Sequence, residues 1–218
     1  MSPVSTFSGV ADGTWLQNYD DPTDRAWIKV AGADTEIFTG TDGVGYLRSR
    51  WPLGGPYYYY APSDLGATMA KAKVRLPAAN PTSGDTTFGG VALAIQKPDG
   101  TAPTTGSAQH AISEAYFAII SKNGSDSEFS IGKKLTGGSS NRTTWKVSSL
   151  AAFWGSDLEI MLRIIGDDVV TYLNNVEVHR QTDTSLRGGH AGIGFWNGHE
   201  AARNTAPYGL YQFDAGVA

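Results

Sequence analysis

Residues 158–196, LEIMLRIIGDDVVTYLNNVEVHRQTDTSLRGGHAGIGFW, hold the pattern that decides the fold. From Leu158 onward every second residue is Leu or Ile, and a period of two indicates a strand with one buried face. The stretch predicts three short strands, at 158–165, 169–173 and 176–179. Asp167-Asp168 and Asn174-Asn175 separate them, and such residues suit tight hairpin turns because they tolerate positive φ.

The composition favours turn-rich β structure over helix. Only 17% of the residues are charged, 27 are glycine and none is cysteine, so neither disulfides nor thiolate metal sites contribute. The length of 218 residues suits a single all-β domain spanning 1–218. A net charge of −4 argues against a nucleic-acid partner. No apolar run approaches the roughly 18 residues of a membrane span, so no membrane insertion is expected.

The rest of the chain predicts more short strands, for a total of about a dozen. We expect them at 15–19, 26–32, 35–38, 45–49, 67–76, 88–95, 115–120, 128–135 and 208–214. Residues 97–113 are rich in Pro, Thr, Gly and Ser and predict a surface loop, and 144–154 could hold a helical turn or two. The residues predicted to face the core are Val74, Leu93, Ile119, Leu162, Ile164, Ile193 and Phe195.

Two segments carry a resemblance to a known family. The closing meander, with its GGHAGIGF sequence at 188–195, resembles the concanavalin A-like lectin/glucanase (laminin-G-type) sandwiches. Residues 7–19, FSGVADGTWLQNY, are similar to the opening of sandwiches of this group, including bacteriophage tail proteins. The resemblance implies an antiparallel jelly-roll β-sandwich in which the C-terminal strand returns beside the opening one. It implies adhesion, sugar binding or assembly more often than catalysis.

The sequence lacks the residues that catalysis on this fold requires. A retaining glycosidase needs two carboxylates about 5–5.5 Å apart, and the glucanases of the resembled family supply them from a Glu-x-Asp-x-(x)-Glu pattern that is absent here. The nearest pairs, which lack the third carboxylate, are Asp34/Glu36, Asp126/Glu128 and Asp157/Glu159. We therefore expect that the protein is not an enzyme. The open alternative is a glycan-cleaving enzyme with an unfamiliar pair of carboxylates, one of which is Glu114 or Glu159.

No metal or cofactor is predicted. The histidines, His110, His179, His190 and His199, have no metal-binding spacing. Calcium is common in laminin-G-type sandwiches, and the resemblance makes Asp20, Asp21 and Asp24 candidates for its ligands, together with Asp167/Asp168. Turn formation explains both groups equally well.

The segment 51–60, WPLGGPYYYY, has the most unusual local composition. On a strand, Tyr57 and Tyr59 would face one way and Tyr58 and Tyr60 the other. Aromatic side chains stack on sugars and anchor protein interfaces, and they also pack in cores, so all three roles stay open. The residues predicted to bind a ligand or partner are Trp51, Tyr57, Tyr58, Tyr59, Tyr60, Trp196, Asn197 and His199.

The N-terminus lacks the basic and apolar regions of a signal peptide. A signal that has been removed, a protein that works inside a cell and a virus-particle protein released by lysis all agree with this, and Met1 favours the latter two. Together with the absence of cysteine and of a catalytic motif, the last of these leads us to expect a non-enzymatic structural and adhesion protein of a virus particle. By resemblance it would be a bacteriophage minor tail or capsid decoration protein. Its expected partners are other virion subunits, with a host-surface glycan and a second copy of the chain left open. The alternative is a free carbohydrate-binding module.

Overall fold

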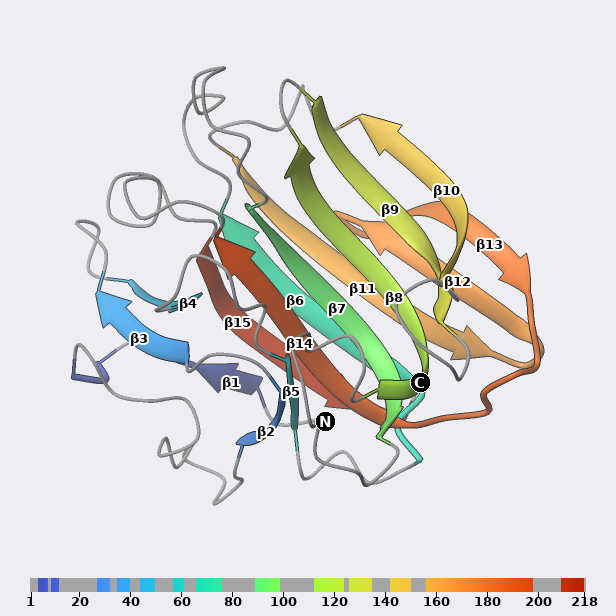
Figure 1. Ribbon diagram of the computed structural model, residues 1–218, viewed down its shortest axis with the longest axis horizontal. Coiled ribbons are helices and arrows are strands. Elements are labelled where there is room, and N and C mark those ends of the chain that lie inside the picture. Colours follow the sequence, from blue (N-terminus) through green and yellow to red (C-terminus); the bar gives the residue numbers. More distant parts are fainter. Residues whose placement is uncertain are drawn as a thin grey trace.

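The computed structural model describes residues 4–7, 9–11, 27–31, 35–39, 44–49, 57–60, 66–75, 89–98, 112–123, 126–134, 142–149, 156–197 and 209–217. In these residues every regular element is a β-strand, and the strands form two antiparallel sheets that pack face to face (Figure 1). The predicted antiparallel jelly-roll sandwich is confirmed.

The eight-stranded sheet contains both described ends of the chain. Its order is β13 (Val176–Thr182), β12 (Asp168–Leu173), β11 (Asp157–Ile165), β6 (Met69–Arg75), β15 (Gly209–Gly216), β4 (Gly45–Ser49) and β3 (Thr35–Thr39), and β1 (Val4–Thr6) also pairs with β15. The C-terminal strand thus returns beside the opening one, as predicted, although the opening strand is β1 and residues 15–19 lie outside the described part.

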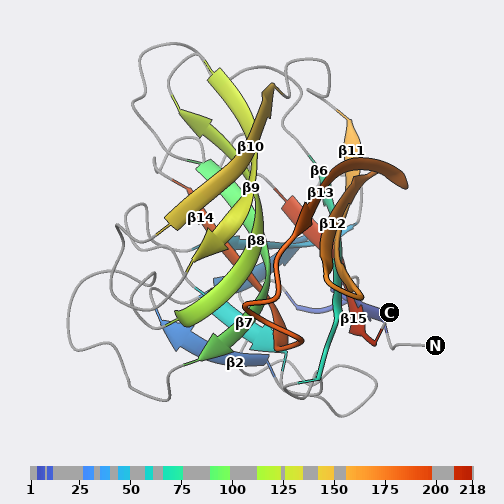
Figure 2. The ribbon, with the colours of Figure 1, turned by 90° about the vertical axis from the view of Figure 1, so that its right-hand side faces the viewer.

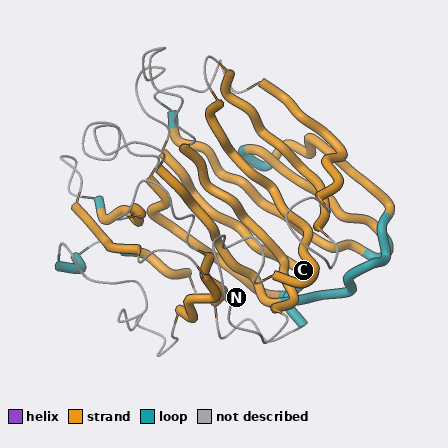
Figure 3. Tube along the Cα trace, viewed as in Figure 1, coloured by secondary structure: helices purple, strands orange, loops and turns teal. Residues whose placement is uncertain are grey.

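The seven-stranded sheet forms the other layer (Figure 2). Its order is β10 (Arg142–Ser149), β9 (Asp126–Lys134), β8 (Ile112–Asn123), β7 (Gly89–Pro98), β14 (His190–Asn197), β5 (Tyr57–Tyr60) and β2 (Trp27–Ala31). The predicted helical turn at 144–154 is wrong for residues 144–149, which belong to β10. The β10 strand is half exposed and lies at a sheet edge, so its apolar residues do not follow a simple alternation. Figure 3 shows strands joined by loops and turns, and no helix, in the described trace.

The predicted meander is confirmed as β11, β12 and β13. The Asn174-Asn175 turn uses the backbone conformation that the sequence implied, whereas the other turn lies one residue earlier than predicted, because Asp168 already belongs to β12. Asn174 and Asn175 both have positive φ, 49° and 65°, which is the pattern of a type I′ turn. At the other turn Gly166 has a φ of 61°, so glycine occupies the position where a side chain would be strained.

The core lies between the sheets and draws on nearly the whole described chain, from Phe7 to Ala215. In β11, alternate residues from Leu158 to Ile164 are buried, as the period of two required. Val74 and Ile193 are also core residues, as predicted. The side chains of Leu93 and Phe195 lie outside the described residues, although Leu93 pairs with the core residues Ala118 and Ile193.

The prediction that Ile119 faces the core between the two sheets is wrong. Ile119 is buried, but it packs with Phe117 in a separate cluster, whereas Ala118 and Ile120 belong to the core. The run 115–120 is apolar at every position, and a run with both faces covered does not reveal which set of alternate residues points inward.

Replacing Leu162 with Ala should lower the free energy of unfolding by roughly 2–5 kcal/mol, because its fully buried side chain would leave a cavity. Met161→Ala is the matched control, since Met161 is only half-buried on the opposite face of the same strand. Urea titrations of both variants would test this. An equal loss in both would show that the inner face is wrongly assigned.

Candidate functional site

The seven-stranded sheet places several of the predicted binding residues in the neighbouring strands β5 and β14. Two register rows cross this sheet on the face that carries Phe117 and Ile119. The first row contains Tyr57, Gly194, Ala92, Ile119, Ser130 and Val147. The second contains Tyr59, Gly192, Ala94, Phe117, Gly132 and Thr144. We call this face, defined by these two rows, the outer platform. Its described central residues, Phe117, Ile119, Ser130, Gly132 and Gly192, are buried, whereas Thr144 and Val147 at its β10 end are exposed.

Small residues occupy the centre of the outer platform for a packing reason. A Cβ on Gly132 would lie 2.1 Å from the carbonyl oxygen of Thr143 and 2.8 Å from Cζ of Phe117. The backbone of Thr143, together with the ring of Phe117, therefore occupies the space that a side chain at position 132 would need. Beside the tyrosines, Gly192 and Gly194 present no side chain at all. Tyr57 and Tyr59 thus each pair with a residue that has no side chain.

The four tyrosines form β5, and their side chains lie outside the described residues. In the backbone, Tyr57, Tyr58 and Tyr59 pair with Gly194, Ile193 and Gly192 of β14. Tyr60 pairs with Trp27 of β2.

The other predicted binding residues are placed only in part. The side chains of Trp196 and Asn197 lie outside the described residues, and their backbones pair with Gly90 and Gly89 of β7. Trp51 and His199 lie outside the described residues. The binding role of the whole set stays a prediction. Sequence reasoning missed the small-residue rows, although the alternating glycines of Gly192-Ile-Gly194 were a usable signal.

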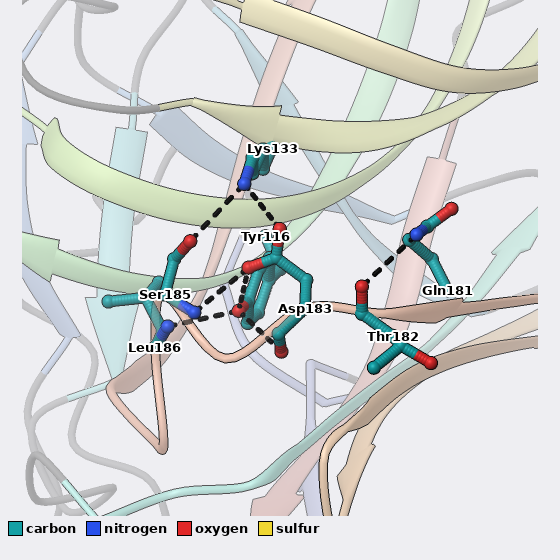
Figure 4. Close-up of polar contacts among 7 residues, drawn as sticks. All are labelled: Tyr116, Lys133, Gln181, Thr182, Asp183, Ser185 and Leu186. Carbon is teal, nitrogen blue, oxygen red and sulfur yellow. Dashed lines mark hydrogen bonds and ion pairs between the residues drawn. The ribbon is translucent and has the colours of Figure 1, made fainter.

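A second cluster of polar side chains lies where the chain crosses from β13 to β14 (Figure 4). We call it the Asp183 cluster: Tyr116, Lys133, Asp183, Ser185 and Leu186. The Tyr116 hydroxyl donates to the Asp183 carboxylate at 2.7 Å and accepts from the Leu186 N–H at 2.9 Å. The Ser185 N–H also donates to Asp183, at 2.9 Å, and Lys133 forms an ion pair with it.

These contacts fix the charge of the Asp183 cluster. Burial alone would raise the pKa of Asp183, but hydrogen bonds from Lys133 and Ser185 hold it well below its usual range. Burial, assisted by Asp183, raises the pKa of Tyr116 to about 12. At neutral pH the carboxylate is therefore ionised and the phenol is neutral. Neither group is suited to proton transfer near pH 7, and the cluster anchors the crossing chain.

The carboxylates of the catalytic alternative lie in different sheets. Glu159, in the eight-stranded sheet, forms an ion pair with Lys71 at 3.7 Å. Glu114 lies in β8 of the seven-stranded sheet, opposite Lys97. Glu114 and Glu159 therefore do not form a catalytic pair with each other.

The described part of the chain contains no group of three or more His, Asp or Glu residues arranged to hold a metal ion. Asp167 pairs with Arg187, and Asp168 pairs with Arg180 at 2.9 Å. Asp20, Asp21 and Asp24 lie outside the described residues. Among the described residues, a search for helices of membrane-spanning length and hydropathy found none.

No family model matches the chain, and no curated protein matches its sequence. Solved structures do resemble it. The exoplasmic/lumenal domain of VIP36, in a Ca²⁺/Man-bound form, has a TM-score of 0.59 at 11% identity, covering 100% of this chain and 89% of that one. The CBM2 module of the evolved Dit of Lactobacillus casei BL23 phage J-1 has a TM-score of 0.54 at 10% identity, with coverage of 95% and 96%.

An enzyme shares the fold as well. The laminarinase catalytic domain of Thermotoga maritima MSB8 has a TM-score of 0.51 at 9% identity, covering 91% of this chain and 79% of that one. At such identities the likeness concerns the fold alone, and function has to be argued from the site.

Asp183→Asn should destabilise the protein at neutral pH, and the difference from wild type should shrink as the solution becomes acidic. A carboxylate whose pKa is lowered by folding stabilises the native state above its unfolded pKa of about 3.9, and this stabilisation is lost as the pH falls through the folded value. Urea unfolding between about pH 7 and pH 3 measures the effect. Asp167→Asn is the control, because Asp167 is exposed. A difference that stays constant down to low pH would contradict the assignment.

Proposed function

We propose that this protein is a non-enzymatic carbohydrate-binding module that holds a glycan on its outer platform. The observation that carries the proposal is the backbone pairing of β5, a strand of four consecutive tyrosines, with Gly192 and Gly194 of β14. Aromatic rings stack on the apolar C–H faces of sugars, and glycine lets a flat ring approach the backbone closely. The lectin and carbohydrate-binding modules among the structural neighbours support this choice.

We further propose that the module belongs to a bacteriophage particle, as a minor tail or capsid decoration protein that leaves the host by lysis. The likeness to a module of a phage Dit protein and the resemblance of residues 7–19 to tail-protein sandwiches support this setting. In that setting the protein would contact other virion subunits as well as the host glycan. Virion proteomics tests the assignment, and absence of the chain from purified particles would overturn it.

Tyr57→Ala with Tyr59→Ala should abolish or strongly weaken glycan binding while leaving the fold intact. Truncating an aromatic anchor typically costs about 2 kcal/mol or more of binding energy, which is roughly thirtyfold in Kd. A glycan array of host-surface polysaccharides would identify the ligand, and calorimetry would measure the loss. Val176→Ala, an exposed residue of the opposite sheet, is the control. Unchanged binding in the double variant would refute the outer platform as the site.

The enzymatic alternative predicts a different result in the same samples. A glycoside hydrolase would release reducing ends from the bound polysaccharide, and Glu114→Gln or Glu159→Gln would stop that release. We expect no release by the wild-type protein. Measurable turnover that depends on either glutamate would replace the proposal with catalysis.

A further inference from the structure

The edge strands β10 and β13 lie on the same lateral side of the sandwich (Figure 1), and each contains an irregularity in its pairing. In β10 the register shifts between Thr144 and Lys146, which makes Trp145 an extra residue. In β13 the register passes from Glu177 to His179, which makes Val178 an extra residue. Such bulges redirect side chains and release backbone groups from the ladder.

The two bulges engage each other across the gap between the sheets. The Trp145 and His179 rings lie 6.2 Å apart between centroids, and Nζ of Lys146 donates a 2.6 Å hydrogen bond to the carbonyl of Val178. We call these four residues the β10–β13 clasp. Tyr116 also packs against Trp145, at 5.8 Å between ring centroids, and so joins the clasp to the Asp183 cluster. Side chains thus close this side of the sandwich.

His179 is the one residue of the clasp whose charge changes near neutral pH. It is half-buried opposite Thr171, and its Nε2 atom is buried without a hydrogen-bond partner among the described residues. The Thr171 hydroxyl is buried without a partner as well. Nε2 of His179 therefore makes no hydrogen bond that would stabilise the charged form of the imidazole.

The charges around His179 oppose its protonation. From β10, Lys146 faces it, and burial together with that ammonium lowers the pKa of His179. Lys133 and Asp183 lie beyond Trp145 and Tyr116 and neutralise each other. On its own strand, Glu177 and Arg180 pair with each other, and Arg180 also pairs with Asp168.

We propose that the β10–β13 clasp is an acid-sensitive latch that closes this side of the sandwich at neutral pH and releases it in mild acid. Protonation would place a second cation beside Lys146, in a site where Nε2–H has no acceptor, and an unpaired buried charge is costly. Release would separate β10 from β13 and free both edge strands to pair with another chain.

The direction of the pH effect follows from the lowered pKa. An open state binds the proton more readily than the closed one, so the latch is fully stabilised above the unfolded pKa of about 6.5 and weakens as the pH falls below it. The stabilisation from Asp183 is lost only below about pH 3.9. The two effects therefore occupy different pH ranges and can be measured separately.

Hydrogen–deuterium exchange at about pH 7 and about pH 5, corrected for intrinsic rates, tests the latch. We expect peptides from β10 and β13 to lose several-fold more protection in acid than peptides from the central strands β7 and β11. His179→Gln should remove this excess loss, whereas the matched control His190→Gln, in β14, should keep it. An equal response of edge and central strands, or an excess loss that persists in His179→Gln, would overturn the proposal.

A second variant keeps the test decisive if His179→Gln does not fold. Lys146→Gln removes the neighbouring cation, so the imidazole of His179 should titrate at a higher pH than in the wild type. NMR of the ring protons measures this shift directly, and a merely structural role for Lys146 would not produce it. Equal titration midpoints in the two proteins, or a wild-type midpoint above about 6.5, would refute the latch.

Discussion

The sandwich depends on one passage of the chain, in which residues 183–189 leave the edge of the eight-stranded sheet and enter the seven-stranded sheet at β14. Several contacts hold this passage. The N–H of its first residue, Asp183, donates a hydrogen bond to the carbonyl of Asp167, and the Asp183 carboxylate accepts one from the Tyr116 hydroxyl. The N–H of its last residue, Gly189, donates to the carbonyl of Ala67. Leu186 between them is buried in the core. Because β14 pairs with both β5 and β7, the register of the outer platform follows from where this passage ends.

The two faces of the seven-stranded sheet carry different residues, and the same register determines which residues lie on each face. Its inner face contributes large apolar residues such as Ile120, Phe129 and Ile193 to the common core, which supplies the main driving force for folding. Its outer face carries a separate buried cluster, Phe117 with Ile119, in rows that also contain glycine and alanine.

Sequence reasoning predicted local structure well where one face of a strand is buried and the other is not. The alternation at 158–165 and the Asn174-Asn175 turn determine both the strands and the turn conformation, because each depends on neighbouring residues alone. It failed at 115–120, where both faces are covered and only the tertiary structure distinguishes Ile119 from Ile120. It also missed the Asp183 cluster. Tyr116 and Asp183 are 67 residues apart, and a lone Asp after a strand reads as an ordinary turn residue.

The lateral side of the sandwich shows how edge strands can be protected without a further strand. Backbone hydrogen bonds cannot close the gap between two sheets. Long side chains close it instead: Lys146 and Trp145 of β10 contact Val178 and His179 of β13. Lys146 also occupies a carbonyl that the bulge at Val178 frees from the β13–β12 ladder, which removes one acceptor from the exposed edge. This protection rests on few contacts and on an uncharged imidazole beside a cation. The core, by contrast, contains no titratable group that changes charge near neutral pH among its described residues, so mild acid can weaken the edge selectively.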